Sequence, residues 1–247
     1  MLPNIGRTLP TSLVAALWLA SPTALAQSAP EVEVRSTADG ASLYLGSEQP
    51  FHTTAGQIAN ARRIDVPGAR PFAILWDENR DGETSSHYAL SLDGRSIATV
   101  RETSYEILMR RGHFDPLVEA PDLSGSALPP GGDVYFVQFQ TQTLQEYRDV
   151  ITALGGDVYN FVSNHTHLVR MAPSVRDSVA ALPFVRWVGA FHTEFRIDGE
   201  ILSAINAGTL GTAKYNVMVF ERGLAQRQVV ADASTALGGT IEPLHPA

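Results

Sequence analysis

The sequence contains no cysteine and only one lysine, Lys214. The absence of cysteine excludes disulfide bonds, thiolate metal sites, thiol catalysis and lipid attachment through a cysteine. The other basic residues are arginines, and the formal net charge is −8. An acidic chain without basic clusters argues against a nucleic-acid partner, because neutralisation of phosphates dominates that kind of binding. We therefore expect a protein that is held together by its apolar core alone.

Long hydrophobic runs are also scarce, and the most apolar stretch lies at the N-terminus. Arg7 precedes the run Leu13–Ala20, Ser21-Pro22 follows it, and Ala24-Leu25-Ala26 carries small residues at both ends. This order is typical of a secretory signal peptide and predicts cleavage after Ala26. The run is shorter than the roughly 20 residues that a membrane span needs, which makes a membrane anchor the weaker alternative. The mature protein is expected to be secreted or periplasmic and not to bind membranes.

The composition predicts two structured regions after a loose leader over residues 27–40. Residues 41–130 are expected to be β-rich, with short strands such as Phe72–Trp76 and Tyr88–Leu92 and a tight turn at Asp93-Gly94. The cluster Ser124–Gly132, rich in Gly, Pro and Ser, predicts a linker between domains.

Residues 131–200 carry the clearest pattern and predict an α+β module. Strands are expected at 134–139, 157–162, 167–171 and 186–191, and helices between Thr143 and Leu154 and from Pro173 to Pro183. Thr143 and Glu146 predict a capping box at the first helix, and Gly155-Gly156 predicts its end. The order β-α-β-β-α-β is that of a ferredoxin-like fold.

A second copy of this pattern is expected over residues 212–247. Tyr215–Phe220 resembles the first strand, and Thr235–Gly239 repeats Thr152–Gly156 letter for letter. Internal repeats of this kind indicate a duplicated structural unit. The copy covers only the first half of the unit, which would leave apolar surface uncovered, so we expect the chain to be part of a longer protein. The alternative is that the half-unit completes itself against the first copy or a partner chain.

Three stretches of the sequence resemble the N-terminal region of exported bacterial subtilisin-like serine peptidases. They are Tyr135–Phe139, Leu168–Met171 and, with the greatest weight, Leu182–Gly189. Upstream, Ser91–Gly94, Arg101–Tyr105 and Phe114–Leu117 are similar to the leader of some large members, so that the resemblance covers roughly residues 70–245. It implies a ferredoxin-like propeptide that assists the folding of a catalytic domain and inhibits it until cleavage.

The catalytic motifs of that family are missing from this sequence. It contains no Asp-Thr-Gly, Asp-Ser-Gly, His-Gly-Thr or Gly-Thr-Ser. A serine peptidase needs a nucleophile, a base and an orienting carboxylate within reach of one another. We therefore assign no catalytic, cofactor-binding or metal-binding residue and no cofactor. The expected partner is a subtilisin-like catalytic domain in cis, beyond Ala247.

Two patterns could suggest metal sites, but each has a simpler interpretation. Asp77–Gly82 matches the first half of a calcium loop, yet Tyr88 stands where a bidentate carboxylate is needed, so a hairpin turn is favoured. His165 and His167 would share a face of a strand, with His192 as a third candidate for zinc. No carboxylate lies close to them in sequence, and we expect them to be solvated or hydrogen-bonded.

Two further features indicate an exposed turn and a set of core residues. Asn164-His-Thr166 is formally a glycosylation sequon, although it more simply indicates an exposed turn. The apolar residues Phe184, Trp187, Val188 and Phe191 are expected in the core, with part of their face as a possible contact for a peptidase domain.

The leading functional hypothesis is the propeptide-containing portion of a secreted subtilisin-like endopeptidase. The alternative is a stand-alone secreted binding module or a peptidase inhibitor that acts in trans.

Overall fold

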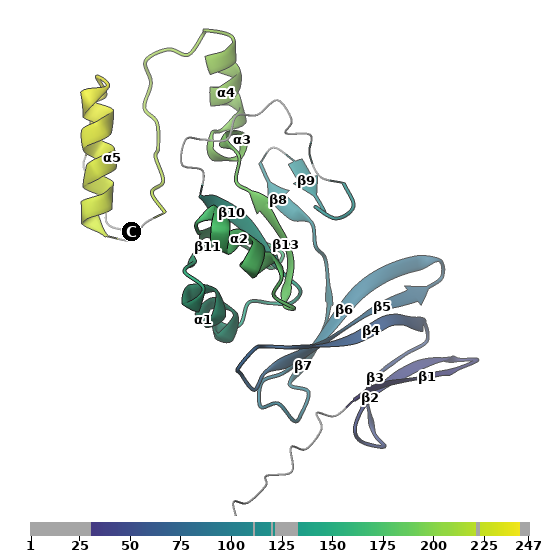
Figure 1. Cartoon of the computed structure of the whole chain (residues 1–247). Helices are drawn as coiled ribbons and strands as arrows, with labels where there is room; N and C mark the ends of the chain where they lie inside the picture. Colours follow the sequence, from purple (N-terminus) through teal and green to yellow (C-terminus); the bar gives the residue numbers. More distant parts are fainter. Residues whose placement is uncertain (1–30, 111, 120, 122–132, 221–222, 243–247) are drawn as a thin grey trace, which may run out of the picture.

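The computed structural model describes residues 31–110, 112–119, 121, 133–220 and 223–242. The expected signal peptide and the expected linker at 124–132 lie outside these residues. The described part is an α+β protein with four open β-sheets and five helices (Figure 1).

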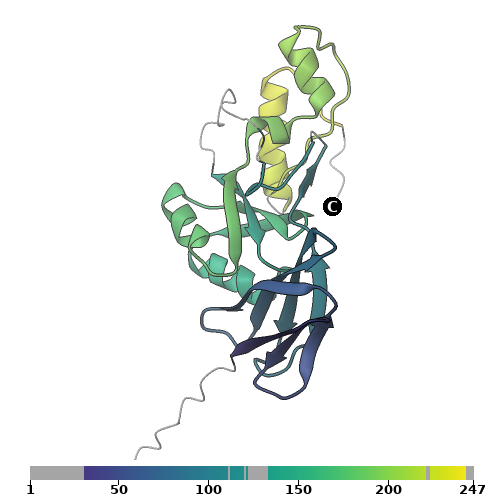
Figure 2. The ribbon, with the colours of Figure 1, turned by 90° about the vertical axis from the view of Figure 1, so that its right-hand side faces the viewer.

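The N-terminal region is built from two antiparallel sheets and a hairpin. The first sheet joins β1 (Val32–Thr37), β2 (Gly40–Leu45) and β3 (Pro50–Thr54). The second joins β4 (Gln57–Asp65), β5 (Phe72–Arg80), β6 (Glu83–Ser91) and β7 (Thr99–Thr103). The hairpin consists of β8 (Ile107–Met109) and β9 (Gly112–Phe114). Figure 2 shows the two sheets of this region from a second side.

Strand β1 corrects the expectation of a loose leader for residues 32–37, while residues 27–30 of that leader lie outside the described residues. It pairs with β2 along its whole length, and Val32 packs against an apolar cluster around Leu43 and Trp76. Val32 is the one partly covered residue of this strand, so β1 is ordered by its pairing with β2 more than by packing.

The turn at residues 81–82 confirms the hairpin interpretation of Asp77–Gly82. Strands β5 and β6 pair up to Arg80 and Glu83, leaving Asp81 and Gly82 as a two-residue turn with φ of 54° and 86°. Positive φ at both central residues is what a type I′ hairpin turn requires.

Residues 134–190 form a four-stranded antiparallel sheet with two helices. The elements follow one another as β10 (Val134–Phe139), α1 (Gln145–Ala153), β11 (Asp157–Ser163), β12 (Thr166–Arg170), α2 (Pro173–Ala180) and β13 (Val185–Ala190). The strand order is β11-β12-β10-β13, which makes β11 and β13 the edges. Both helices lie on the same face of the sheet (Figure 1). These elements agree within a few residues with the strands and helices expected from the sequence.

Helix α1 begins differently from the expectation and ends as expected. Its N-cap is Leu144, without a side-chain cap, so the predicted capping box of Thr143 and Glu146 is wrong. The helix starts one residue later than a Thr143 cap would need, which removes the hydroxyl from reach of the first amides. At the other end Gly155 has φ of 95°, and the amides of Gly155 and Gly156 donate to Thr152 and Ile151. This is a Schellman cap, for which glycine is suited because it adopts positive φ at no steric cost.

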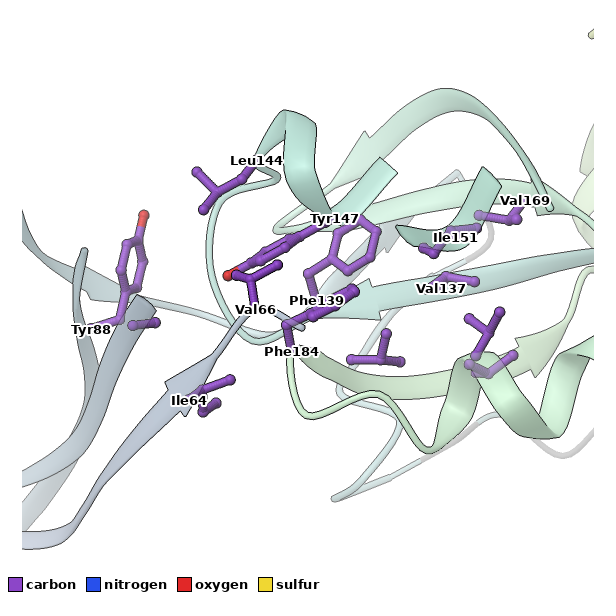
Figure 3. Close-up of a cluster of buried hydrophobic side chains, with 14 of the residues drawn as sticks. Ile64, Val66, Tyr88, Val137, Phe139, Leu144, Tyr147, Ile151, Val169 and Phe184 are labelled. Carbon is purple, nitrogen blue, oxygen red and sulfur yellow. The ribbon is translucent and has the colours of Figure 1, made fainter. Parts of the chain in front are cut away.

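The largest apolar core joins the N-terminal region to the four-stranded unit. Ile64, Val66 and Tyr88 from the β4–β7 sheet and the turn after β4 belong to the same cluster as Tyr147 and Phe184 (Figure 3). The rings of Tyr147 and Phe184 stack at 4.2 Å between centroids. The hydroxyl of Tyr88 also donates to the side-chain oxygen of Gln142 at 3.4 Å. The two regions therefore share a core instead of only touching.

The C-terminal part is helical and loosely packed. Helices α3 (Thr193–Arg196) and α4 (Gly199–Asn206) follow β13, and α5 (Leu224–Ala236) lies apart from the sheets (Figure 1). The strand expected over Tyr215–Phe220 is wrong, because these residues join no sheet among those described. A strand is stable only where another strand satisfies its backbone groups, and none of the described strands pairs with this segment.

Candidate interaction surface

An aromatic layer covers the face of the β10–β13 sheet opposite to helices α1 and α2. Phe136 lies at its centre, 5.0 Å from Phe191 and 5.3 Å from Phe195 between ring centroids. The hairpin β8–β9 contributes Met109, and Phe114 stacks on Phe195 at 6.0 Å. Edge-to-face and offset ring pairs of this kind add to the free energy gained by burying apolar area.

The four apolar residues singled out in the sequence divide between the two faces. Phe184 and Val188 lie in the core beneath the helices, whereas Phe191 belongs to the aromatic layer. Trp187 lies on the aromatic side and remains only half buried. Of the four, Trp187 is therefore the residue that can contact a partner.

Gly189 allows the indole of Trp187 to lie flat along the edge strand β13. A Cβ atom at position 189 would come within 2.0 Å of the Trp187 ring. Real Cβ contacts are never that short, so any side chain at 189 would force the indole away from the sheet. The sequence Trp187-Val188-Gly189 thus encodes the orientation of this aromatic surface.

A strap of residues 103–110 and 112–115 fastens the N-terminal region to the unit through polar contacts. Thr103 Oγ1 lies 2.6 Å from His165 Nε2, and the Leu108 amide donates to Ser163 Oγ at 2.8 Å. The hydroxyl of Tyr105 donates to the carbonyl of Gln140 at 2.8 Å, and burial raises the pKa of Tyr105 to about 12. The strap therefore follows the turn between β11 and β12 and one end of β10.

Arg186 is the centre of a nearly buried ion-pair network under this strap. Its two terminal nitrogens donate to the two carboxylate oxygens of Asp115 at 2.7 and 2.9 Å. One of them also donates to Gln138 Oε1 at 2.7 Å, and the guanidinium lies 4.1 Å from the centre of the Tyr105 ring. A bidentate arginine–carboxylate pair has fixed geometry, which sets the position of the strap on β13.

Gln138 explains why a polar residue stands inside the buried strand β10. Its side-chain amide is fully buried and donates to the carbonyl of Tyr105 at 2.8 Å and to Thr166 Oγ1 at 3.2 Å. Sequence reasoning passed over this residue and over Asp115. Gln138 could have been recognised as a glutamine within an otherwise apolar strand. A buried amide requires hydrogen-bond partners from elsewhere in the chain, which would have prompted a search for them.

The candidate zinc histidines do not come together. His165 lies in the turn with φ of 67° and faces Tyr88 and Tyr105, whereas His167 lies in β12 and packs on Phe139. His165 is not on a strand, so the expected shared face is wrong. Burial lowers the pKa of both imidazoles to about 4, which keeps them neutral. Within the part of the chain that the structure describes, no three His, Asp or Glu side chains are grouped to hold a metal.

The expectation that these histidines are solvated or hydrogen-bonded holds only in part. His167 is 3% exposed, and its Nδ1 has no hydrogen-bond partner among the described residues. The same holds for Nδ1 of His192, the N-cap residue of α3. The rings of Phe139 and Phe161 pack against His167, and a backbone hydrogen bond with Tyr159 holds the imidazole on its other side.

A second polar cluster, which the sequence did not reveal, lies between the two N-terminal sheets. The Glu78 carboxylate accepts hydrogen bonds from Trp76 Nε1 at 3.0 Å and from His52 Nε2, and His87 Nε2 lies 3.7 Å away. Burial acts to raise the pKa of Glu78, but the hydrogen bonds outweigh it and hold the pKa below its usual value. The cluster satisfies a buried carboxylate and links β3 to β5.

Comparison with known proteins gives one match. A family model described as "Domain of unknown function (DUF8729)" matches residues 108–192, which run from β8 to just after β13. No curated protein and no solved structure matches the chain. The matched segment includes the β8–β9 hairpin and the Arg186–Asp115 pair together with the four-stranded unit. No helix among the described residues has the length and apolar character needed to cross a membrane.

Proposed function

We propose that residues 131–200 are a ferredoxin-like, propeptide-type module of an exported subtilisin-like serine peptidase. The observation that carries the proposal is the strand order β11-β12-β10-β13 with α1 and α2 as crossovers on one face. This is the order of a split β-α-β fold. The resemblance of Leu182–Gly189 to the propeptide region of that family supplies the link to peptidases.

The module acts as a folding assistant and inhibitor of a catalytic domain in cis, beyond Ala247. A folding template must itself be stable, and the shared core with the β4–β7 sheet makes this module more than an isolated small sheet. Domains with many contacts between distant residues fold slowly, and a preformed surface lowers the entropic cost of their assembly. The chain carries none of the family's catalytic motifs, so it contributes no residue to peptide hydrolysis.

The half-buried Trp187 on edge strand β13 is the surface proposed to meet the catalytic domain. Tryptophan is enriched among the residues that dominate binding energy at protein interfaces. Helix α3 and Phe220 cover the middle of the aromatic layer, which leaves this edge as the accessible part.

Inhibition of a subtilisin-type peptidase by the purified chain tests this proposal. We expect inhibition by the 247-residue chain, and at least a tenfold loss of affinity in Trp187→Ala. Leu92→Ala is the matched control, since Leu92 is an exposed apolar residue just after β6 and should change nothing. Inhibition that is equally strong in Trp187→Ala would contradict the proposed surface.

The mass of the native secreted product tests whether a catalytic domain lies in the same chain as the module. A precursor well above 26.6 kDa that reacts with a serine-directed activity probe is the expected result. If no larger precursor is ever seen but the chain still inhibits, the alternative of a secreted inhibitor in trans replaces the proposal. If it neither inhibits nor occurs in a larger precursor, the peptidase connection fails, leaving a secreted binding module.

A further inference from the structure

Residues 215–220 lie as an extended, unpaired segment against the aromatic layer of the four-stranded unit. After α4 the chain turns back toward β11 (Figure 1), and Phe220 packs against the layer. The Phe220 ring stacks on Tyr159 of β11, with 6.2 Å between ring centroids, and meets Phe191 edge-on at 5.9 Å. Two aromatic side chains from different parts of the unit thus form a seat for one aromatic ring, and the chain's own Phe220 occupies it.

Phe220 is the main anchor of this segment on the unit. Its neighbours Val217 and Met218 are 69% and 74% exposed, so they bury little apolar area. The side-chain amide of Asn160 donates to the Met218 sulfur at 4.0 Å, but a thioether is a weak acceptor. No described strand pairs with residues 215–220, so a ladder of backbone hydrogen bonds does not hold them either. One aromatic ring therefore carries most of the contact.

The other parts of the chain that cover the aromatic layer are fixed by stronger polar contacts. The bidentate Arg186–Asp115 pair lies directly after β9 and holds the β8–β9 hairpin in place. Helix α3 is tied to the unit through Arg196 Nε, which donates to the carbonyl of Phe191 at 3.0 Å. Charge-assisted hydrogen bonds of this kind are about twice as strong as neutral ones, so the segment with Phe220 is the cover that leaves most easily.

The site beneath Phe220 has a second feature that the chain's own segment leaves unused. Strand β11 is an edge strand, so its outer backbone groups face no strand of the described sheets. An extended polypeptide can add to such an edge, where main-chain hydrogen bonds supply affinity and side-chain pockets supply specificity. A segment that pairs with β11 and also seats an aromatic ring between Tyr159 and Phe191 gains bonds that residues 215–220 do not make. Such a segment would therefore displace Phe220.

We propose that Tyr159, Phe191 and the outer edge of β11 bind an extended segment of a partner protein that carries an aromatic side chain. In the free chain Phe220 occupies the seat and acts as an internal competitor. A tethered competitor is present at a high effective concentration, so the partner must displace it and its apparent affinity is reduced. The site goes beyond the proposed function, because β11 and β13, the strand of Trp187, are opposite edges of the sheet.

Binding of a labelled peptide to the full chain, followed by fluorescence polarisation, tests this site. The probe is the amidated peptide Lys-Tyr-Asn-Val-Met-Val-Phe, the sequence of residues 214–220, which is free to pair with β11 once it is no longer tethered. The Phe220→Ala variant has an empty seat and should bind the probe at least about tenfold more tightly than the wild type. Adding Tyr159→Ala to that variant should reverse the gain. Val217→Ala is the matched control, since its exposed side chain lies in the same segment, and it should match the wild type.

Hydrogen exchange provides the second measurement and detects a folding defect in either variant. The probe should slow the exchange of the β11 amides in Phe220→Ala, while exchange in the central strand β10 stays that of the wild type. Equal affinity of the wild type and Phe220→Ala for the probe, including no binding by either, overturns the inference. Tight binding that survives Tyr159→Ala, or replacement of the probe's own Phe by Ala, overturns it as well. These results leave the inhibition assay of Trp187→Ala unchanged, so that the two proposals fail separately.

Discussion

The two copies of the expected β-α-β pattern share the segment Thr-Ala-Leu-Gly-Gly and have very different surroundings. In both, the helix ends at the same glycine pair and carries the same Gln–Asp hydrogen bond. In the first copy the preceding strand is the centre of a sheet, and in the second the corresponding described residues join no sheet. Helix ends are thus determined by neighbouring residues, whereas a strand forms only when a partner strand is present.

The largest effect expected within this comparison is loss of the buried ring in the first copy. Tyr147→Ala removes a fully buried side chain that stacks on Phe184, and should lower the free energy of unfolding by about 3–5 kcal/mol. The corresponding change in the second copy, Val230→Ala, should cost less than about 0.5 kcal/mol. Urea unfolding of both variants measures the difference. Equal losses would show that the two copies are packed alike.

Acid should destabilise the first copy selectively, because residues 217–241 contain no histidine. The folded state holds the pKa of His167 at about 4, below the ordinary 6.5, so the unfolded chain binds more protons as the pH falls below about 6.5. Stability is therefore lost between about pH 6.5 and pH 4, by on the order of 3 kcal/mol from this residue. In His167→Gln this part of the pH dependence should disappear. Urea unfolding at a series of pH values measures it, with the exposed His113→Gln as a control that should match the wild type.

Substitution of the glycine that ends each helix compares the two copies through a smaller change in stability. Gly155→Ala forces a Cβ atom into the positive-φ region and should lower the free energy of unfolding by about 1 kcal/mol. Gly238→Ala meets the same strain, but α5 is hardly packed, so the global unfolding curve should not move. Far-ultraviolet circular dichroism should instead report a loss of helix in Gly238→Ala. A global loss in Gly238→Ala would mean that α5 unfolds together with the core.

The smallest expected effect concerns the hydrogen bond that both helices share. Gln145→Ala and Gln228→Ala each remove one side-chain bond across a helical turn, worth about 0.2–0.5 kcal/mol. We expect Gln228→Ala to increase hydrogen exchange within α5 and Gln145→Ala to leave exchange in α1 almost unchanged, since packing holds α1 in place. Site-resolved hydrogen exchange distinguishes the two. Equal increases in both helices would contradict this view of α1.

Much of the fold could be predicted where an element is determined by residues close together in the sequence. The strands and helices of residues 134–190 follow from alternating and helical periodicity, and the turns at Asp81-Gly82 and Asn164-His165 follow from residues that tolerate positive φ. The capping box failed because Thr143 lies one residue before the N-cap. The strand at Tyr215–Phe220 failed because its residues favour a strand but the described chain gives them no partner.

The candidate surface was harder to predict, because it depends on residues far apart in the sequence. Trp187 was recognised as a possible contact, but the sequence did not separate it from Phe184 and Val188, which face the opposite side. The partners Asp115 and Gln138 of Arg186 lie 71 and 48 positions away, beyond the range of any local pattern. The His52–Glu78–His87 cluster was missed for the same reason, since its members come from three strands.

The core shared by the β4–β7 sheet and the four-stranded unit has a consequence for proteolysis. A protease that cuts between Pro121 and Asp133 would break the chain without separating the two pieces, because Ile64, Val66 and Tyr88 would still pack against Tyr147 and Phe184. The nicked protein should pass through a sizing column as a single species and fall into two bands only under denaturing conditions. What limited digestion releases from this molecule is therefore a poor guide to where its folding units begin.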